Sequence, residues 1–126
     1  MTAFSRNTLS KEERISSRSD IAKLFNGGRY GSVGCIRYCF IEGGDFSRVL
    51  ISVRKRDFKR AVKRNLLKRR IRESYRLQKS VLDGYPVDIM FLYTSKEVLG
   101  FDEVYASVGS ALAAVARKLS MKGLRP

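Results

Sequence analysis

The stretch from Lys59 to Glu73 reads Lys-Arg-Ala-Val-Lys-Arg-Asn-Leu-Leu-Lys-Arg-Arg-Ile-Arg-Glu, and it decides how the chain is organised. It lies within the basic segment 54–76, which holds 12 of the 26 Lys and Arg residues in 23 positions. Only two acids, Asp57 and Glu73, fall in this segment, so 12 cations minus two acids leave +10 of the formal +14. Because apolar residues remain inside the block, we predict a helix with one charged face rather than a disordered basic tail.

On a helical wheel, one face of this helix gathers polar side chains. At 100° per residue, six of them fall within about 140° of one another: Arg64, Asn65, Lys68, Arg69, Arg72 and Arg76. Leu67, Ile71 and Ser74 occupy a separate arc that suits packing on a sheet. Like charges four residues apart cost a few tenths of a kcal/mol per pair, and one local acid is available to offset them. Such a pattern favours a polyphosphate partner, and we predict nucleic acid, with RNA preferred.

Further cations precede the helix, where a predicted strand turns into it. Arg54, Lys55, Arg56 and Lys59 extend the basic patch around this corner. The planar guanidinium of Arg donates two hydrogen bonds to phosphate, whereas Lys serves as a point charge. Asn65 both donates and accepts, so it suits a base edge or a 2′-hydroxyl.

The N-terminal part predicts a lead-in and a short helix. Residues 1–18 are polar and weakly patterned, which indicates an extended or frayed segment. Ser19 or Asp20 would cap a helix over residues 21–25, ended by the Asn-Gly-Gly sequence at 26–28.

A β-hairpin is expected next. Residues 31–34 predict a loop because glycine stands at both ends. Residues 35–41 and 48–53 are rich in β-branched and aromatic side chains, and the turn sequence at 42–45 separates them. This order predicts two antiparallel neighbours.

The basic helix would begin between Asp57 and Ala61 and reach about Lys79. Residues 83–86 break the chain, and residues 87–93 form the most apolar segment, predicted to be a central strand covered on both faces. A cap at Asp102 would then start a C-terminal amphipathic helix, whose apolar positions are Val104, Val108, Ala111, Leu112, Val115 and Leu119.

The 126 residues predict one domain over 1–126, and a hydrophobic content of 44% is enough for a core. No apolar run approaches the roughly 20 residues that span a bilayer, and no secretory signal stands at the N-terminus, so we expect a cytoplasmic protein without membrane contact. The chain has no histidine, which excludes Ser-His and Cys-His nucleophilic pairs. Cys35 and Cys39 would stand roughly 13 Å apart on a strand, too far for a disulfide. We therefore interpret them as reduced core residues.

Together with its flanks, this segment resembles the protein subunit of bacterial ribonuclease P. The matching order is Ser52-Val53-x-Lys55, then Ala61-Val62-x-Arg64-Asn65-x-x-Lys68-Arg69-x-x-Arg72-Glu73. The flanks that agree are Leu9-Ser10-Lys11-Glu12-Glu13-Arg14-Ile15, Asp20-x-x-x-Leu24-Phe25-x-x-Gly28 and Val87-Asp88-Ile89. The family's central triplet is usually Arg-Asn-Arg, and Leu66 replaces its last residue here. The wheel places Leu66 about 160° from Arg64, off the cationic face.

The resemblance implies a small α/β sandwich similar to the second domain of ribosomal protein S5. A central mixed sheet would carry the basic helix in a left-handed βαβ crossover, with further helices at the N- and C-terminal ends. The general rule for parallel strands predicts the opposite hand.

It also implies that the chain is part of an endonuclease. The family's RNA subunit carries out the Mg²⁺-dependent hydrolysis that releases the 5′ leader of precursor tRNA. The protein binds that RNA and the leader, supplies no catalytic side chain or metal site, needs no organic cofactor and does not require a protein oligomer. The residues that would face RNA are Arg64, Asn65, Lys68, Arg69 and Arg72.

The resemblance further implies an aromatic-lined cleft for the leader. Phe25 matches a cleft aromatic, Ile21 stands where another is common, and Tyr38 or Phe40 would line the cleft from a strand, near Ser52. Stacking of unpaired bases suits such side chains, although core packing is the commoner role of any single aromatic.

Two other readings of the basic face stay open. A structural RNA-binding or ribosomal protein would use the same patch without taking part in cleavage. A basic amphipathic helix also binds membrane surfaces, but here the apolar arc is narrow and is needed by the sheet.

Overall fold

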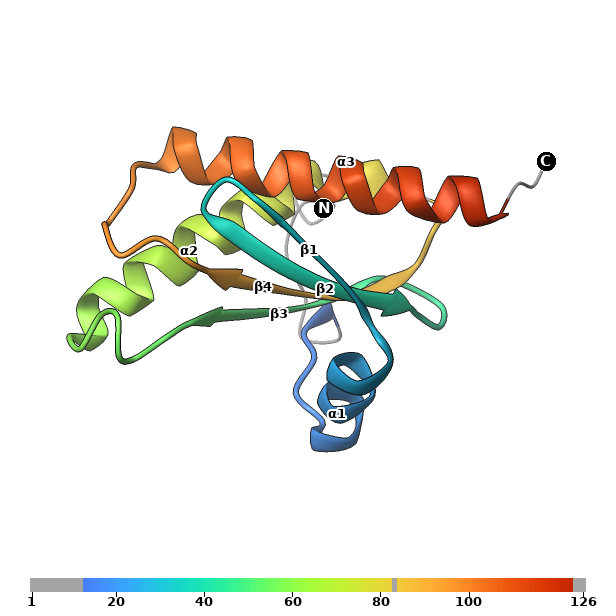
Figure 1. The fold of residues 1–126 in the computed structure, drawn as a ribbon, viewed down its shortest axis with the longest axis horizontal. Coiled ribbons are helices and arrows are strands. Elements are labelled where there is room, and N and C mark those ends of the chain that lie inside the picture. The colour runs from blue at the N-terminus through green and yellow to red at the C-terminus, as the bar shows by residue number, and fades with distance from the viewer. Residues whose placement is uncertain (1–12, 83, 124–126) are drawn as a thin grey trace, which may run out of the picture.

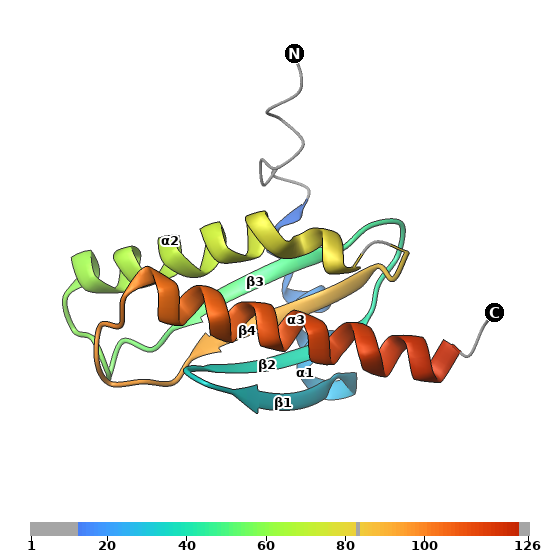
Figure 2. The ribbon, with the colours of Figure 1, turned by 90° about the horizontal axis from the view of Figure 1, so that it is seen from above.

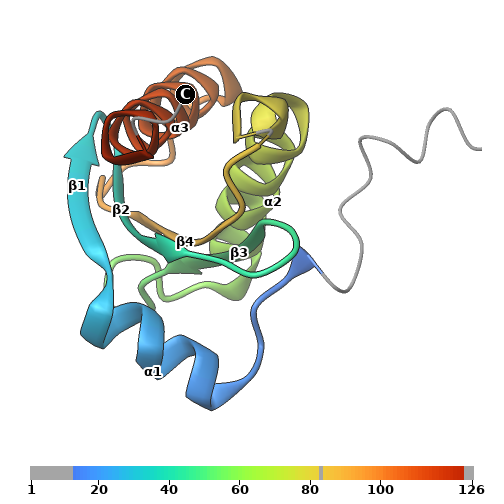
Figure 3. The same cartoon turned by 90° about the vertical axis from the view of Figure 1, so that its right-hand side faces the viewer.

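The computed structural model describes residues 13–82 and 84–123. Its elements, in chain order, are α1 (Arg18–Gly27), β1 (Arg29–Val33), β2 (Ile36–Glu42), β3 (Arg48–Val53), α2 (Ala61–Gln78), the 3₁₀ helix η3 (Lys79–Leu82), β4 (Val87–Tyr93) and α3 (Phe101–Gly123). The four strands form one mixed sheet in the order β1-β2-β4-β3. Helices α2 and α3 cover one face of this sheet, and α1 lies against the other (Figure 1, Figure 3). The expected fold class, an α/β sandwich with a small mixed sheet, is confirmed.

The principal core lies between the sheet and the two long helices. Alternate residues of each strand point into it, as Ile36, Tyr38 and Phe40 do from β2. Helix α3 contributes the six apolar positions expected from its spacing, all of them buried. A smaller cluster on the other face joins Leu24 of α1 to Cys39 and Met90. Both cysteines are free and buried, as predicted.

Helix α2 is held by the arc predicted from the wheel. The three predicted residues, Leu67, Ile71 and Ser74, are buried, and so is Tyr75, which the wheel did not assign to this arc. Ser74 is accommodated in the core because its hydroxyl donates to the carbonyl of Arg70 at 2.7 Å. Burying an aliphatic side chain such as that of Leu67 or Ile71 contributes about 1.5–3 kcal/mol to stability. This is far more than the repulsion between neighbouring cations costs.

The chain crosses from β3 through α2 to β4, which are parallel neighbours. Viewed from the side of the helices, both strands point left, and the chain moves from β3 at the top to β4 below it through a helix in front of the sheet (Figure 2). This is a left-handed crossover, as the resemblance implied and against the general preference.

The predicted β-hairpin is wrong, because β2 and β3 are not neighbours. β4 lies between them, antiparallel to β2 and parallel to β3. The most apolar strand takes an inner position, as predicted for residues 87–93, and all of its residues except Leu92 are buried. The segment between β2 and β3 is fixed instead to the start of β4: Gly43 N–H donates to the Pro86 carbonyl at 2.9 Å.

The loop predicted at residues 31–34 is also wrong, since Arg29–Val33 forms the edge strand β1. Gly31 pairs with Tyr38, and a β-carbon at position 31 would collide with the ring of Tyr38. Glycine is therefore required here for close packing within a strand, which a sequence pattern cannot distinguish from a turn. Only Gly34 of this segment has a positive φ, 58°.

The boundaries of the terminal helices differ from the prediction. α1 begins at Arg18, and its N-cap is Ser17, whose hydroxyl accepts from the Asp20 amide. α3 begins at Phe101, so Asp102 lies in its first turn rather than at the cap. Residues 1–12 of the expected lead-in lie outside the described residues. The part that follows is not frayed, because Ile15 is buried and its amide donates to the Val49 carbonyl at 3.0 Å.

Replacing Leu67 by Asp should abolish cooperative unfolding, because it places an unpaired charge in the core beneath α2. Val62 is 77% exposed on the same helix and provides the control. Val62→Asp should change the free energy of unfolding by no more than about 0.5 kcal/mol. Thermal denaturation followed by circular dichroism measures both, and a cooperative transition retained in Leu67→Asp would show that α2 is oriented differently.

Candidate nucleic-acid interface

The predicted cationic face of α2 is directed away from the core. Asn65 and Arg69 are exposed, and the other four predicted residues, Arg64, Lys68, Arg72 and Arg76, are half-buried along its margins. None of the six belongs to the buried arc. The backbone of one rigid helix therefore fixes the spacing of five cations, and this surface is suited to a run of phosphates.

Two cations of the patch form ion pairs within the protein. Arg76 pairs with Glu73 one turn before it, and the hydrogen bond lowers the pKa of the Glu73 carboxyl. Arg54 donates to Asp57 at 3.0 Å, which closes the turn between β3 and α2. Lys68, Arg69 and Arg72 form no ion pair within residues 13–82 and 84–123. The uncompensated charge is thus concentrated in the middle of the helix.

Arg64 also stabilises the turn that precedes α2. Its guanidinium donates to the carbonyls of Phe58 at 2.8 Å and Lys59 at 2.9 Å, which precede the helix. These contacts hold the corner whose exposed residues include Lys55, Arg56 and Lys59. The corner therefore presents its cations in a defined position next to the start of α2.

The start of α2 adds to the positive potential. Its N-cap is Arg60, which makes no capping hydrogen bond through its side chain, and no acid lies in the first turn. Cations at a helix N-terminus oppose the helix dipole and lower stability, whereas an anion there is favoured. An anionic partner bound at this end of the helix would therefore relieve a repulsion that the isolated protein retains.

The opposite face of the sheet is only partly covered. α1 crosses it near the start of β4, and the sheet beyond it is open on the left in Figure 1. The row beyond α1 runs from Ser32 through Arg37 and Leu92 to Ser52, as the strand register shows. We call this row, together with Phe25, the open sheet face.

Phe25 lies at the border of this face. Asp20 reaches Arg48 on one flank of α1, and by helical spacing Ile21 and Phe25 share the other flank. Phe25 is 43% exposed, and its carbonyl accepts from the Tyr30 hydroxyl at 3.0 Å. The structure therefore places the predicted Phe25 and Ser52 beside the same exposed surface.

Tyr38 and Phe40 are not part of it, which corrects the expectation that one of them lines a cleft. They share a strand face, as predicted, but it is the face beneath α3, where they are 4% and 1% exposed. Their rings pack 6.3 Å apart, and Lys118 lies over the ring of Tyr38. Their role is core packing.

Arg37 and Leu92 are members of the open sheet face that sequence reasoning missed. The sequence did contain a signal for Arg37. Ile36, Tyr38 and Phe40 alternate with Arg37 and Cys39, and side chains on a strand alternate between its two faces. The three large apolar residues therefore mark the core face, and Arg37 belongs to the opposite face. Arg14 was missed as well, because only the fold brings it next to Lys68 and Arg72.

Arg48 ties α1 to the sheet on the other flank. It donates to Asp88 through Nε at 3.0 Å and through a terminal nitrogen at 2.6 Å, and to Asp20 at 3.0 Å. These partners raise the pKa of the Arg48 guanidinium, so it remains charged. The position of Phe25 depends on this junction, since α1 carries both Asp20 and Phe25.

The described part of the chain offers no protein metal site. No three of its His, Cys, Asp or Glu side chains come together as ligands. Asp20 and Asp88 approach one another, but Arg48 occupies the space between them. No helix in the described part is long and apolar enough to cross a membrane.

Comparison with known proteins agrees with this geometry. Residues 9–116 match the family model of Ribonuclease P. The chain is 33% identical to a ribonuclease P protein component of Porphyromonas gingivalis, over 99% of this chain and 98% of that one. The solved structure of the ribonuclease P protein from Thermotoga maritima superposes with a TM-score of 0.71 at 28% identity, over 81% and 96% of the two chains. The chain belongs to the ribonuclease P protein family.

The fold of the family extends to more distant members. The Staphylococcus aureus ribonuclease P protein is 23% identical and superposes with a TM-score of 0.71, over 85% of this chain and 97% of its own. The family resemblance drawn from the basic helix is thus confirmed. The departure at position 66 is accommodated, because Leu66 is half-buried and lies outside the set of six polar residues.

Replacing Asp88 by Asn should lower the free energy of unfolding by about 1–3 kcal/mol, because it leaves Arg48 partly buried with one carboxylate fewer. Glu73→Gln is the control, since its ion pair with Arg76 lies on the helix surface, with the Glu73 side chain 44% exposed, and should contribute at most about 1 kcal/mol. Urea denaturation measures both. Equal losses in the two variants would contradict the structural role of the Arg48 junction.

Proposed function

We propose that the chain acts as the protein subunit of a ribonuclease P holoenzyme in which an RNA subunit cleaves the 5′ leader from precursor tRNA. The cationic face of α2 binds the RNA subunit, and the open sheet face receives the single-stranded leader. The observation that supports this proposal most strongly is that one small domain presents two different surfaces, the cationic face of α2 and the open sheet face. A charged helix suits folded backbone, whereas an apolar sheet surface with an exposed aromatic suits unpaired bases.

The different roles that we propose for the two surfaces follow from the side chains that each presents. Along α2, the amino and guanidinium groups of Lys68, Arg69 and Arg72 offer donors to phosphate oxygens, and Asn65 offers an amide to a base edge or 2′-hydroxyl. On the open sheet face, Leu92 and Phe25 offer apolar surface while Arg37 and Ser52 offer donors. A leader lying there would stack on Phe25 without regard to its sequence.

Hydrolysis itself is assigned to the RNA. The chain has no histidine, and its described carboxylates form no cluster that could hold a catalytic ion. Magnesium supplies Lewis acidity and an activated water when bound, and we propose that RNA oxygens hold it. The protein contributes by positioning the leader and neutralising backbone charge. We further propose that the chain works in the cytoplasm, without an organic cofactor and without requiring a protein oligomer.

Reconstitution tests the function. The protein alone should not cleave precursor tRNA, and it should enable its cognate RNA subunit to cleave at low Mg²⁺ and physiological salt, because it replaces part of the charge screening that the ion supplies. Gel analysis of 5′-labelled precursor measures this. No stimulation under these conditions, together with co-purification of ribosomal RNA, would instead indicate a ribosomal role.

Arg69 provides the cleanest test of the helix, because Arg64 also braces the fold. Arg69→Ala should weaken binding of the RNA subunit about tenfold, as expected for the loss of one charge-assisted contact. Arg117 of α3 is an exposed arginine on another helix. Arg117→Ala should stay within about twofold of wild type in a filter-binding assay, and equal effects would mean that only net charge matters.

Phe25→Ala should weaken holoenzyme binding of leader-bearing precursor at least fivefold, since one base stack contributes about 1–3 kcal/mol. Its affinity for mature tRNA should not change. Tyr105 on α3 has a similar exposure, 37%, and Tyr105→Ala should leave both affinities unchanged. A loss shared by precursor and mature tRNA in Phe25→Ala would contradict the leader role of the open sheet face.

A further inference from the structure

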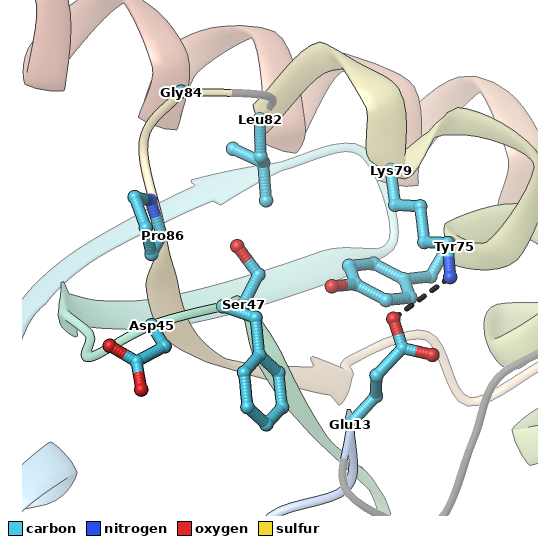
Figure 4. Close-up of a pocket in the computed structure, with 9 residues that line it drawn as sticks. Glu13, Asp45, Ser47, Tyr75, Lys79, Leu82, Gly84 and Pro86 are labelled. Atoms are coloured by element: carbon cyan, nitrogen blue, oxygen red, sulfur yellow. Dashed lines mark hydrogen bonds and ion pairs between the residues drawn. The ribbon is translucent and has the colours of Figure 1, made fainter.

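A groove runs between α2 and the edge strand β3, and residues 13–15 cross it. Its two hollows are lined by different residues of neighbouring segments. One, of about 180 Å³, is lined by Arg14, Lys68, Arg72 and β3 from Val49 to Ile51. The other, of about 270 Å³, is lined by Glu13, Ser47, Tyr75 and Lys79, with Phe46 and Leu82. Figure 4 shows the second hollow.

The two hollows are adjacent along three of the segments that line them. Glu13 and Arg14 are consecutive residues, and Ser47 stands two residues before Val49. Arg72 and Tyr75 are less than one helical turn apart, about 4.5 Å along the axis, and on the wheel Lys68, Arg72 and Tyr75 fall within about 60°. A ligand with one anionic and one planar end could therefore occupy both.

The first hollow suits an anion. Three cations from two distant parts of the chain, Arg14, Lys68 and Arg72, line it, and no acid is among its lining residues. None of the three forms an ion pair within the described residues. The docking of Ile15 on Val49 fixes the backbone of Arg14 there, through the 3.0 Å hydrogen bond between them.

The second hollow contains a hydroxyl without a partner. Tyr75 is fully buried, and its hydroxyl forms no hydrogen bond in the structure. Figure 4 shows this hydroxyl pointing into the space between Leu82 and Ser47. Burial raises the pKa of Tyr75, so the group remains a neutral donor. A buried hydroxyl left unpaired destabilises a fold, so a partner that supplied a hydrogen bond to it would be favoured.

The other polar groups complete a mixed set of donors and acceptors. Ser47 Oγ accepts from the Val87 amide at 3.1 Å and keeps its own proton to donate. Glu13 and Asp45 offer carboxylate oxygens, and Phe46 offers a ring that is 47% exposed. Amide and ring-nitrogen edges of a nucleobase match such a set, and its faces match an aromatic ring.

We propose that this groove binds one extruded nucleotide of the RNA subunit, with its phosphate held by Arg14, Lys68 and Arg72 and its base in the hollow against the Tyr75 hydroxyl. The inference rests on the proposed function and adds a base-specific contact to it. RNA is the partner because cations form the adjoining hollow and the chain carries +14. The Tyr75 oxygen is closed to water in the free protein, so the base reaches it by displacing the side chains of the solvent-facing side, where Glu13 pairs with Lys79 at 2.9 Å.

Tyr75→Phe removes only the hydroxyl. Because that group has no partner in the free protein, the thermal midpoint should stay equal or rise, while affinity for the cognate RNA subunit transcript should fall about fivefold to tenfold, as for one lost hydrogen bond. Tyr93→Phe is the matched control. The Tyr93 hydroxyl donates to the Glu97 carbonyl and accepts from the Leu99 amide, so this variant should lose stability and keep its RNA affinity within about twofold.

Arg14→Gln tests whether the first hollow binds the phosphate of the nucleotide. It should reduce the magnitude of the slope of log affinity against log salt by about one, whereas Tyr75→Phe should leave that slope unchanged. Wild-type RNA affinity in Tyr75→Phe would show that the RNA does not contact this hydroxyl and would overturn the inference, and so would a parallel loss of stability and affinity. A wild-type protein that does not bind the transcript at all would overturn the proposed function itself.

Discussion

The burial of one arc of α2 against the sheet determines how the rest of this molecule is used. Leu67, Ile71 and Tyr75 are fully buried beneath the helix. Because their side chains fix the rotation of α2, the cations of the same helix cannot turn inward to find acids. The fold thereby retains a row of like charges that a free helix in water would not favour. The stability lost to this repulsion, a few tenths of a kcal/mol per pair, is small beside the apolar burial that holds the helix in place.

The two faces of the sheet differ in how completely they are covered. The face beneath α2 and α3 is closed and contains most of the aromatic residues, including Tyr38 and Phe40. On the other face, α1 is a short helix anchored by Leu24 and by the junction of Arg48 with Asp20 and Asp88. Since α1 covers only part of this face, the row from Ser32 to Ser52 stays open beside Phe25. Two different surfaces thus arise around one sheet, the cationic face of α2 and the open sheet face, and the edge of β3 contributes to the groove between α2 and residues 13–15.

Much of the fold could be predicted from local patterns, and the failures share a physical cause. The basic helix, the central strand and the C-terminal helix were correct because periodicity and apolar content report burial along a single element. The hairpin failed because strand order depends on which strand gains most from being central, and β4 lies more than 30 residues after β3. Gly31 was misread because its partner, the ring of Tyr38, comes from another strand. For the site, the leader-cleft role of Phe25 and Ser52 stays a prediction, whereas finding Arg37 required the correct strand face and finding Arg14 required the docking of the lead-in.

The central claim is that α2 presents its cations together as a surface for RNA backbone. Its most direct test is the affinity of the intact protein for its cognate RNA subunit, measured by filter binding over a range of monovalent salt. With six to eight phosphate contacts, the logarithm of the association constant should fall against the logarithm of salt with a slope of about −5 to −7. A slope shallower than about −2 would mean that few phosphates are engaged, and it would contradict this account of the helix.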